Sequence, residues 1–282
     1  MQLCWFNDRR LGLVQGDVVI DITSVLPQLS TPADPFSMSD YLIQTLAEVR
    51  AGAEKFKASG AGIPVKSVKL LSPVLRPSKI IGAPVNYHDH ISEAKNATTV
   101  FKQYDGGIED QGLFLKASSS LVGCGEGIDV HFPGRPTHHE IELAVIIGKT
   151  GKNIPQEQAL TYVAGYAIAL DMTLRGNEDR SFRKSIDSYS VLGPWLTTAD
   201  EIADPQNLDF TLEVNGTLRQ RSNTSDMIMK IDRQIAWAST FYTLYPGDII
   251  MTGTSAGVGP VHPGDVIVAK MQALGEMNVK VR

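Results

Sequence analysis

Hydrophobic residues in the first quarter of the chain follow two different patterns. Short apolar runs on either side of a turn at Gln15-Gly16-Asp17 predict strands within residues 1–21. After a loop rich in Pro, Ser and Thr, apolar residues recur at helical spacing, which predicts a helix capped by Ser39 or Asp40. The apolar face of this helix consists of Leu42, Leu46, Val49, Ala53 and Phe56. Another strand is expected at residues 65–71.

The remainder of the chain predicts mainly strands. Apolar runs rich in β-branched residues predict strands at residues 79–83, 112–117, 141–148 and 163–170. Residues 208–214 alternate between apolar and polar, and Asn215-Gly216 predicts a hairpin turn into the next strand. Residues 231–244 carry the clearest helical pattern.

A segment with Pro73 and Pro77 is the best candidate for a domain boundary. We therefore expect a small N-terminal α+β domain at residues 1–73 and a larger, mainly β domain at residues 74–282. The predicted fold class is α+β, mainly β.

Composition and charge exclude several classes of protein. The 282 residues are 43% hydrophobic and 20% charged, as in an ordinary globular protein. A net charge of −5 provides no basic surface for nucleic acid or anionic lipid. Cys4 and Cys124 are far apart in sequence, which supports neither a disulfide framework nor a thiolate zinc site. Neither a signal peptide nor an apolar run of membrane-spanning length is recognised, so we expect a cytoplasmic protein.

Three acidic residues mark the ends of two predicted buried strands. Glu140 and Glu142 lead into the strand at residues 141–148, and side chains at i and i+2 of a strand share a face. Asp171 ends the strand at residues 163–170. Buried like charges require a cation, and carboxylates without thiolates suit Mg²⁺ or Mn²⁺ first and Ca²⁺ second. The alternative is a solvated strand end.

A histidine and a glutamate lie three residues apart in the segment that follows the predicted strand at residues 79–83. On a helix, His90 and Glu93 would share a face, and a carboxylate beside an imidazole can activate water. The polar segment at residues 95–107 contains Gly106-Gly107 and is typical of a mobile lid. The alternative is a polar loop that happens to contain histidines.

Several cations follow Asp171. Arg175 could grip a substrate carboxylate through its planar fork, and Lys184 could stabilise a developing enolate. For Arg180 and Arg183 we favour a charged surface loop with mutual ion pairs. His138 and His139, beside the acids, are expected to hydrogen-bond behind the metal ligands or to pack.

Residues 253–257 match the G-x-S-x-G pattern of a nucleophile elbow. The pattern requires a helix directly after the serine, and the glycines and prolines after Ser255 exclude one. A Ser-His-Asp hydrolase is therefore not expected. The loop's backbone amides could instead hold a carboxylate, with the hydroxyl of Thr254 beside them.

Taken together, residues 74–282 resemble the fumarylacetoacetate hydrolase family. The motifs that carry the resemblance are Asn86-Tyr87-x-x-His90-x-x-Glu93, Phe114-Leu115-Lys116, His138-His139-Glu140-x-Glu142-Leu143, Asp171-Met172-Thr173-x-Arg175, Lys184-Ser185-x-Asp187, Gly193-Pro194-Trp195 and Thr252-Gly253-Thr254. The resemblance implies a mixed β-sandwich roll with a small N-terminal domain, homodimers, and a Mg²⁺ or Mn²⁺ ion.

The resemblance also implies roles for individual residues. The metal ligands would be Glu140, Glu142 and Asp171, the acids already selected by the strand pattern. His90 and Glu93 would activate water. The substrate contacts would be Lys184, Arg175, Gln220, Thr254, Tyr87 and Lys116. Glu178 stands where many members have Gln, Gly176 where many have Asp and Ser255 where Pro is common, all near the expected substrate pocket.

The family acts on 2-oxo and 2,4-dioxo acids. For this chain the resemblance implies metal-dependent cleavage of the C3–C4 bond of an acylpyruvate or a 2,4-diketo-3-deoxy sugar acid, with a pyruvate-type product. An oxaloacetate-type decarboxylase or a 2-hydroxy-dienedioate isomerase at the same site is the alternative. A non-catalytic domain, in which the ion only braces two strands, is the third possibility.

Overall fold

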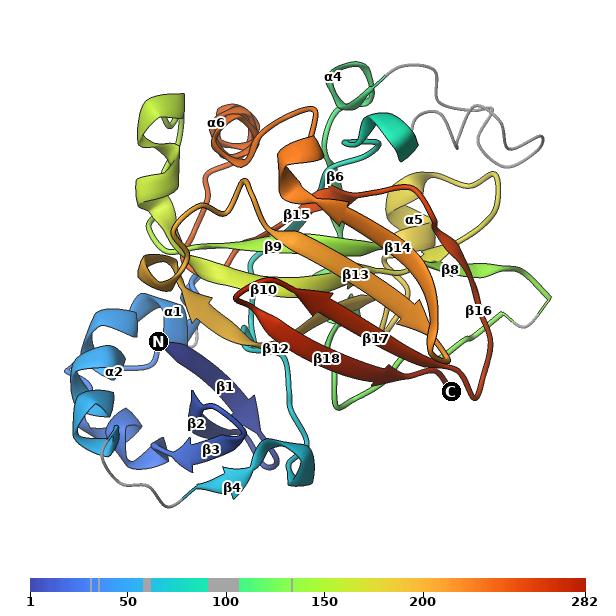
Figure 1. Cartoon of the computed structure of the whole chain (residues 1–282). Coiled ribbons are helices and arrows are strands. Elements are labelled where there is room, and N and C mark those ends of the chain that lie inside the picture. Colours follow the sequence, from blue (N-terminus) through green and yellow to red (C-terminus); the bar gives the residue numbers. More distant parts are fainter. Residues whose placement is uncertain (31, 35, 58–61, 91–106, 133) are drawn as a thin grey trace.

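Most of the strands belong to one large sheet (Figure 1). The computed structural model describes residues 1–30, 32–34, 36–57, 62–90, 107–132 and 134–282. Within these residues the large sheet has eleven strands in the order β4-β3-β2-β1-β12-β10-β9-β15-β5-β6, with β7 beside β12. Their bounds are β1 Gln2–Phe6, β2 Arg10–Gln15, β3 Val18–Asp21, β4 Ile63–Pro64, β5 Ile80–Gly82, β6 Phe114–Lys116, β7 Leu121–Gly123, β9 Ile141–Ile147, β10 Val163–Asp171, β12 Ser190–Thr198 and β15 Ile249–Thr254. Parallel pairing of β12 with β7 and of β15 with β5 makes the sheet mixed.

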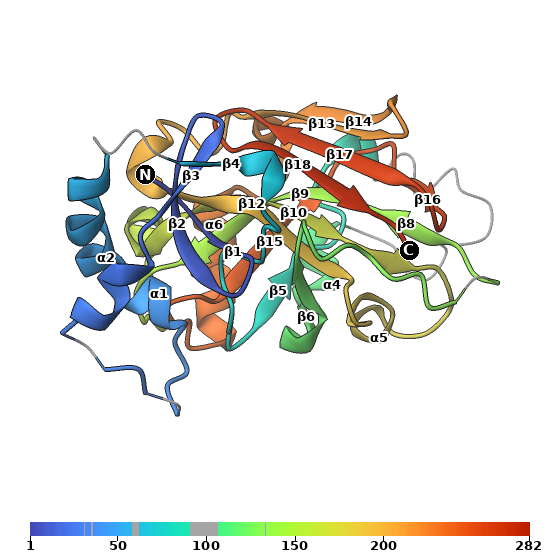
Figure 2. The same cartoon turned by 90° about the horizontal axis from the view of Figure 1, so that it is seen from below.

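Two smaller sheets accompany the large one. The three-stranded sheet has the order β11-β8-β16, and the four-stranded sheet has the order β14-β13-β17-β18. Their bounds are β8 Thr137–His139, β11 Thr173–Leu174, β16 Gly259–Val261, β13 Asp209–Val214, β14 Thr217–Asn223, β17 Val266–Met271 and β18 Gly275–Lys280. Figure 2 shows the four-stranded sheet lying over one face of the large sheet.

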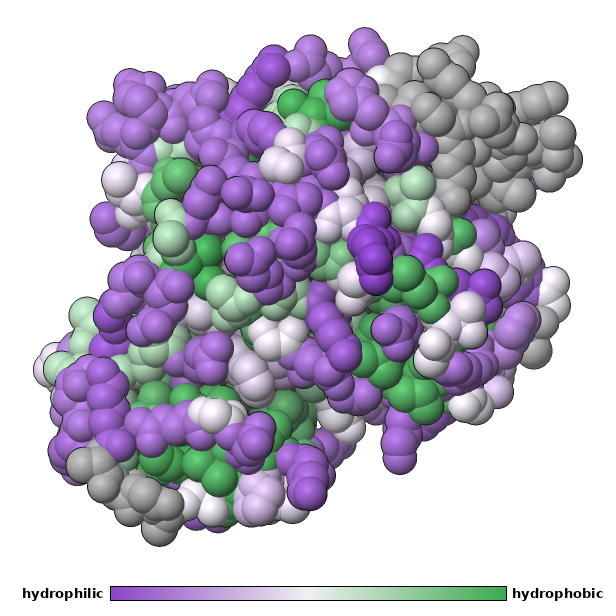
Figure 3. Space-filling view, in the orientation of Figure 1, coloured by the Kyte–Doolittle hydropathy of each residue, from purple (hydrophilic) through white to green (hydrophobic). Residues whose placement is uncertain are grey.

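The alternation of side chains along the central strands builds a hydrophobic core on each face. In β9, Leu143 and Val145 belong to the core beneath the four-stranded sheet, which also contains Phe210 of β13. Ala144 and Ile146 face the opposite core, which includes residues of α1 (Tyr41–Gln44) and α2 (Leu46–Ala53). The predicted mixed β-sandwich is therefore confirmed. In Figure 3 hydrophilic residues cover most of the visible face, and hydrophobic ones form separate patches.

The N-terminal segment extends the large sheet. β1 pairs antiparallel with β12, so β1 to β4 continue the sheet that carries β9 and β10. The boundary at residue 73 stays a prediction. The strand expected at residues 65–71 is wrong over residues 65–67, which form a 3₁₀ turn that the hydroxyl of Ser67 closes by donating to the carbonyl of Pro64 (2.8 Å). Only an isolated antiparallel bridge between Leu70 and Phe6 remains of that strand.

The two helices predicted from the sequence are present, the first of them with one break, whereas α5 (Arg180–Lys184) lies where a charged surface loop was expected. Asp40 caps α1 as expected, accepting from the amide of Ile43 (3.3 Å), but the predicted helix divides at Thr45, whose hydroxyl donates to the carbonyl of Tyr41 (2.7 Å). In the part of the chain that the structure describes, the other α-helices are α4 Ile108–Gln111, α5 Arg180–Lys184 and α6 Ile231–Phe241. Among the described residues no helix is long and apolar enough to cross a membrane.

Curvature of the large sheet brings side chains of β6 and β10 together. In the strand order, β6 lies four places from β10, yet Lys116 of β6 binds the carboxylate of Asp171 at the end of β10. The sheet must therefore curl until its β6 edge approaches β10. This closure places side chains from distant strands around the ends of β9 and β10.

Candidate active site

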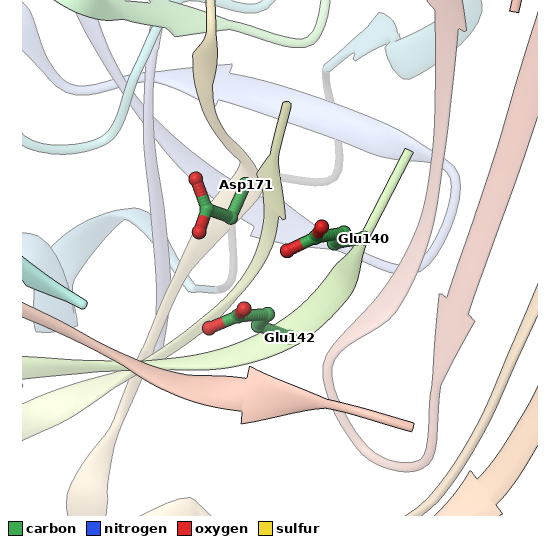
Figure 4. A group of neighbouring side chains, drawn as sticks. All are labelled: Glu140, Glu142 and Asp171. Carbon is green, nitrogen blue, oxygen red and sulfur yellow. The ribbon is translucent and has the colours of Figure 1, made fainter. Parts of the chain in front are cut away.

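Three buried carboxylates meet where β9 begins and β10 ends. Glu140 directly precedes β9, Glu142 lies within it, and Asp171 is the last residue of β10. The backbone amide of Asp171 donates to the carbonyl of Glu140 (2.9 Å), so the strand ends lie side by side. One carboxylate oxygen from each residue lies within 4.8 Å of those of the other two, and at most 5% of any of the three residues is exposed. Figure 4 shows the three side chains converging, the arrangement that the strand pattern predicts.

Cations compensate two of these carboxylates. The Nζ atom of Lys184 donates to Glu140 (2.7 Å) and to Asp171 (2.6 Å). An Nη atom of Arg175 and the hydroxyl of Thr173 each donate to the other oxygen of Glu140, both at 3.0 Å. Burial alone would raise the pKa of Glu140, but Lys184 and Arg175 outweigh burial and hold it well below its usual range.

Lys116 is a buried cation at the far side of Asp171. Its Nζ atom binds the second carboxylate oxygen of Asp171 and also donates to the backbone carbonyl of Tyr189 (2.7 Å). Burial lowers the pKa of Lys116, while the charge of Asp171 opposes that shift. Lys116 and Lys184 therefore hold Asp171 from two directions.

Glu142 is the carboxylate that lacks a compensating cation among the described residues. It accepts a hydrogen bond from the amide of Gly253 (2.7 Å) and takes part in no described ion pair. Gly253 has φ of +99°, and a Cβ there would meet Cβ of Asn86 at 2.6 Å, so only glycine places its amide here. Burial, together with the charge of Asp171, raises the pKa of Glu142 well above its usual value.

The donor set fits a hard divalent cation. All three side chains offer carboxylate oxygens, which Mg²⁺, Mn²⁺ and Ca²⁺ accept as ligands. The uncompensated charge of buried Glu142 is what such an ion would neutralise. These residues can hold a metal, and their role as its ligands stays a prediction.

Comparison with known proteins identifies the family to which the chain belongs. The family model "Fumarylacetoacetate (FAA) hydrolase C-terminal" matches residues 79–282. The chain belongs to the fumarylacetoacetate hydrolase family. It is 48% identical over 288 residues to a maleylpyruvate hydrolase of Aquipseudomonas alcaligenes, a match that covers 100% of this chain and 99% of that protein.

Two further relatives of this family are informative. The crystal structure of maleylpyruvate hydrolase from Sphingobium sp. SYK-6, in complex with manganese(II) and pyruvate, superposes with a TM-score of 0.84 at 42% identity. That match covers 100% of this chain and 98% of the other. A mitochondrial oxaloacetate tautomerase of Rattus norvegicus is 36% identical over 278 residues, covering 94% of this chain and 84% of that protein.

The amide of Gln220 joins the three sheets of this family member beside the acids. Its Oε1 atom accepts from the amide of Ile141 (3.3 Å) and lies 2.9 Å from Nδ1 of His139 in β8. Its Nε2 atom donates to the hydroxyl of Thr254 (2.8 Å) and to the carbonyl of Ser255 (3.1 Å). Gln220 and Thr254, both expected substrate contacts, therefore bond to each other, and Gln220 also bonds to His139, whose supporting role stays a prediction.

The expected water-activating residues are only partly described. His90 is buried. Glu93 and residues 95–106 of the expected lid lie outside the described residues. Tyr87 is buried with its ring edge against Phe210 (ring centroids 6.1 Å apart). Burial, with the charge of Glu142, raises the pKa of Tyr87.

The glycine-rich segment at residues 253–257 donates a backbone hydrogen bond to one of the three acids. β16 follows it, so the helix that a nucleophile elbow requires is absent from these described residues. The amide of Gly253 does hold a carboxylate, as the loop pattern suggested, but that carboxylate belongs to Glu142. This contact was not predictable from the sequence because it depends on the pairing of β15 with β9.

The surface role expected for Arg183 is wrong. Arg183 is buried, and its guanidinium donates to the backbone carbonyls of Leu174 (3.0 Å) and Glu178 (2.8 Å). It therefore stabilises the loop between β11 and α5. The hydrogen bond from Thr173 to Glu140 was not predicted either, although the position of Thr173 two residues after Asp171 on an extended chain offered a signal.

Metal affinity should increase with pH. A proton on Glu142 competes with the metal for the same oxygens, and its pKa in the metal-free protein is raised. We expect Mn²⁺ to bind more tightly as pH rises from about 5.5 to about 8, measured by titration calorimetry at constant ionic strength. An affinity that does not change over this range would contradict the raised pKa.

Proposed function

We propose that this family member is a divalent-metal-dependent hydrolase that cleaves the C3–C4 bond of a 2,4-dioxo acid. The products would be a pyruvate-type acid and a carboxylic acid. The observation that carries the proposal is the convergence of three buried carboxylates on one point, with Lys184 between two of them. Similarity to two maleylpyruvate hydrolases, one of them with manganese(II) and pyruvate bound, supports it.

Glu140, Glu142 and Asp171 would hold Mg²⁺ or Mn²⁺, with Ca²⁺ as a possible substitute in crystals. When bound, the ion supplies a Lewis acid for the carboxylate and 2-oxo oxygens of the substrate. The protein's part is to hold three oxygens in place before the ion arrives. Buried Lys116, bonded to Asp171, would keep that carboxylate ionised and oriented.

The cationic residues have distinct roles in this proposal. Arg175 would bind the substrate carboxylate through its planar guanidinium. Lys184 would place its ammonium next to the enolate that forms when the C3–C4 bond breaks. Since the ammonium already lies between Glu140 and Asp171, little rearrangement is needed during the reaction.

His90, together with Glu93, would take the proton from the attacking water. Tyr87 would face the substrate beside them. Gln220 and Thr254, bonded to each other, would form the wall of the pocket behind Glu140 and Glu142.

An assay of products tests this proposal. We expect the protein to release pyruvate and a carboxylic acid in equal amounts from an acylpyruvate or a 2,4-diketo-3-deoxy sugar acid when Mn²⁺ or Mg²⁺ is present. EDTA should stop the reaction, and added metal should restore it. Full turnover in EDTA would contradict the proposal, as would a metal that only raises the melting temperature while no 2-oxo acid is bound or converted.

Similarity to an oxaloacetate tautomerase makes enol–keto isomerisation the second candidate, with oxaloacetate-type decarboxylation related to it. Only hydrolysis requires activated water. His90→Ala should therefore reduce hydrolysis by about 10²- to 10⁴-fold and leave isomerisation or decarboxylation of oxaloacetate largely intact. Equal losses in these activities would contradict the role proposed for His90.

We also propose, on the family resemblance, that the chain works as a homodimer in the cytoplasm.

A further inference from the structure

A bidentate ion pair lies at the outer side of the loop that carries Arg175. The guanidinium of Arg135 donates to both carboxylate oxygens of Glu178, at 2.8 and 2.7 Å. Both side chains are partly exposed, at 33% and 42%. Together with Gly176 and Asn177 they line a hollow in the surface. The hydrogen bond from Arg135 lowers the pKa of Glu178, which remains ionised opposite the guanidinium.

Arg135 binds the backbone of the loop as well as Glu178. Its Nε atom (3.0 Å) and one Nη atom (2.8 Å) both donate to the carbonyl of Arg175. The amide of Arg175 in turn donates to the carbonyl of Pro136 (2.9 Å). Both polar groups of the Arg175 backbone are thus fixed by two consecutive residues that precede β8.

The ion pair occupies space that only glycine leaves open. A Cβ at Gly176 would lie 1.9 Å from an Nη atom of Arg135 and 2.4 Å from a carboxylate oxygen of Glu178. The backbone of Gly176 is not in the left-handed region, so alanine is compatible with its conformation. A methyl group there would push aside two flexible side-chain ends and leave the backbone in place.

The loop between β11 and α5 connects the Arg135–Glu178 ion pair to the buried acids through Arg175. The side chain of Arg175 is buried, and its guanidinium donates to Glu140 (3.0 Å). On the other side of the loop, buried Arg183 holds the carbonyls of Leu174 and Glu178. Arg183 fixes the two ends of the segment, whereas Arg135 fixes the peptide of Arg175 itself.

We propose that Arg135, held over Gly176 by Glu178, is a positioning residue that aims Arg175 at the substrate carboxylate. The inference rests on the proposed function, in which Arg175 binds that carboxylate. A guanidinium that is already held in place beside Glu140 loses less conformational entropy on binding the substrate carboxylate than one on a loose loop. Because such binding contributes equally to substrate and transition state, its loss changes KM and not kcat.

Three variants test the inference. Arg135→Lys keeps the positive charge but lacks the planar guanidinium, which donates both to Glu178 and to the carbonyl of Arg175. Gly176→Ala displaces the ion pair without removing a polar group. Gly134→Ala is the matched control, since a Cβ at Gly134 meets nothing within 4 Å.

The expected result is a separation of KM from kcat. Arg135→Lys and Gly176→Ala should raise KM for the acylpyruvate about tenfold, because a small displacement of a positioning residue weakens binding strongly. Their kcat should stay within about twofold and their melting temperature within about 2 °C of the unchanged protein. Gly134→Ala should behave like the unchanged protein. An unaltered KM in both test variants would overturn the inference, as would a fall in kcat that follows a loss of stability.

Binding of oxalate to the Mn²⁺-loaded protein, measured by calorimetry, separates this inference from the proposed function. If no dioxo acid is turned over, the proposed function fails. In that case weaker oxalate binding in Arg135→Lys and Gly176→Ala alone would still support the positioning role. Equal oxalate affinity in all the proteins, or no oxalate binding to the unchanged protein, would overturn it.

Discussion

Glu142→Gln is expected to abolish tight binding of divalent metal and, with it, turnover of the 2,4-dioxo acid. Glutamine has nearly the same shape, and its carbonyl can accept the hydrogen bond from the amide of Gly253. It cannot supply the negative charge that a hard cation requires. Lewis-acid assistance is worth several kcal/mol, so kcat/KM should fall by about 10³-fold or more. Calorimetry with Mn²⁺ and a steady-state assay measure the two losses.

The stability of the metal-free protein provides the control for this variant. Because the pKa of Glu142 is raised by folding, the folded state holds the proton more tightly than the unfolded state. The unchanged protein should lose stability as pH rises above about 4.3, the value for an unfolded Glu, towards the folded pKa. Glu142→Gln should remove this loss and be more stable than the unchanged metal-free protein near pH 8. If it still bound Mn²⁺ with unchanged affinity, Glu142 would not be a ligand.

Lys184→Met is expected to be the second most damaging change. It removes the ammonium that lies 2.7 Å from Glu140 and 2.6 Å from Asp171, where the enolate is proposed to form. Loss of such a preorganised charge should lower kcat by about 10²- to 10³-fold. Mn²⁺ should bind at least as tightly as before, since Lys184 no longer competes for the same carboxylate oxygens.

Thermal unfolding distinguishes this loss from misfolding. Without metal, Lys184→Met leaves two buried carboxylates short of a partner, which should cost about 3–5 kcal/mol in the free energy of unfolding. Mn²⁺ should restore most of that stability while kcat remains low. Lys66→Met, on an exposed lysine, removes the same charge as a control and should change neither quantity. Normal kcat in Lys184→Met would exclude the enolate role.

Local periodicity made the centre of the site predictable. Two-residue alternation placed Glu140 and Glu142 on one face, and the apolar run before Asp171 placed that acid at a strand end. The hairpin turn at Asn215-Gly216 was also predictable, because a tight hairpin turn requires positive φ at both residues and Asn and Gly adopt it. These features depend on a few neighbouring residues.

Contacts set by the order and curvature of the strands were not predictable. Lys116 and Asp171 are 55 positions apart and meet only because the large sheet curls. Arg135 reaches the loop of Arg175 because β8 pairs with β11. The 3₁₀ turn at residues 65–67, with its hydrogen bond from Ser67 to Pro64, stands where the apolar pattern predicted a strand.

Anomalous diffraction at the manganese edge, from crystals of the unchanged protein grown with Mn²⁺, tests the metal centre most directly. One strong peak should lie among the carboxylates of Glu140, Glu142 and Asp171, about 2.0–2.6 Å from an oxygen of each. Crystals of Glu142→Gln grown in the same solution should lack it. A peak elsewhere, or none in a protein that still hydrolyses the dioxo acid, would contradict the account.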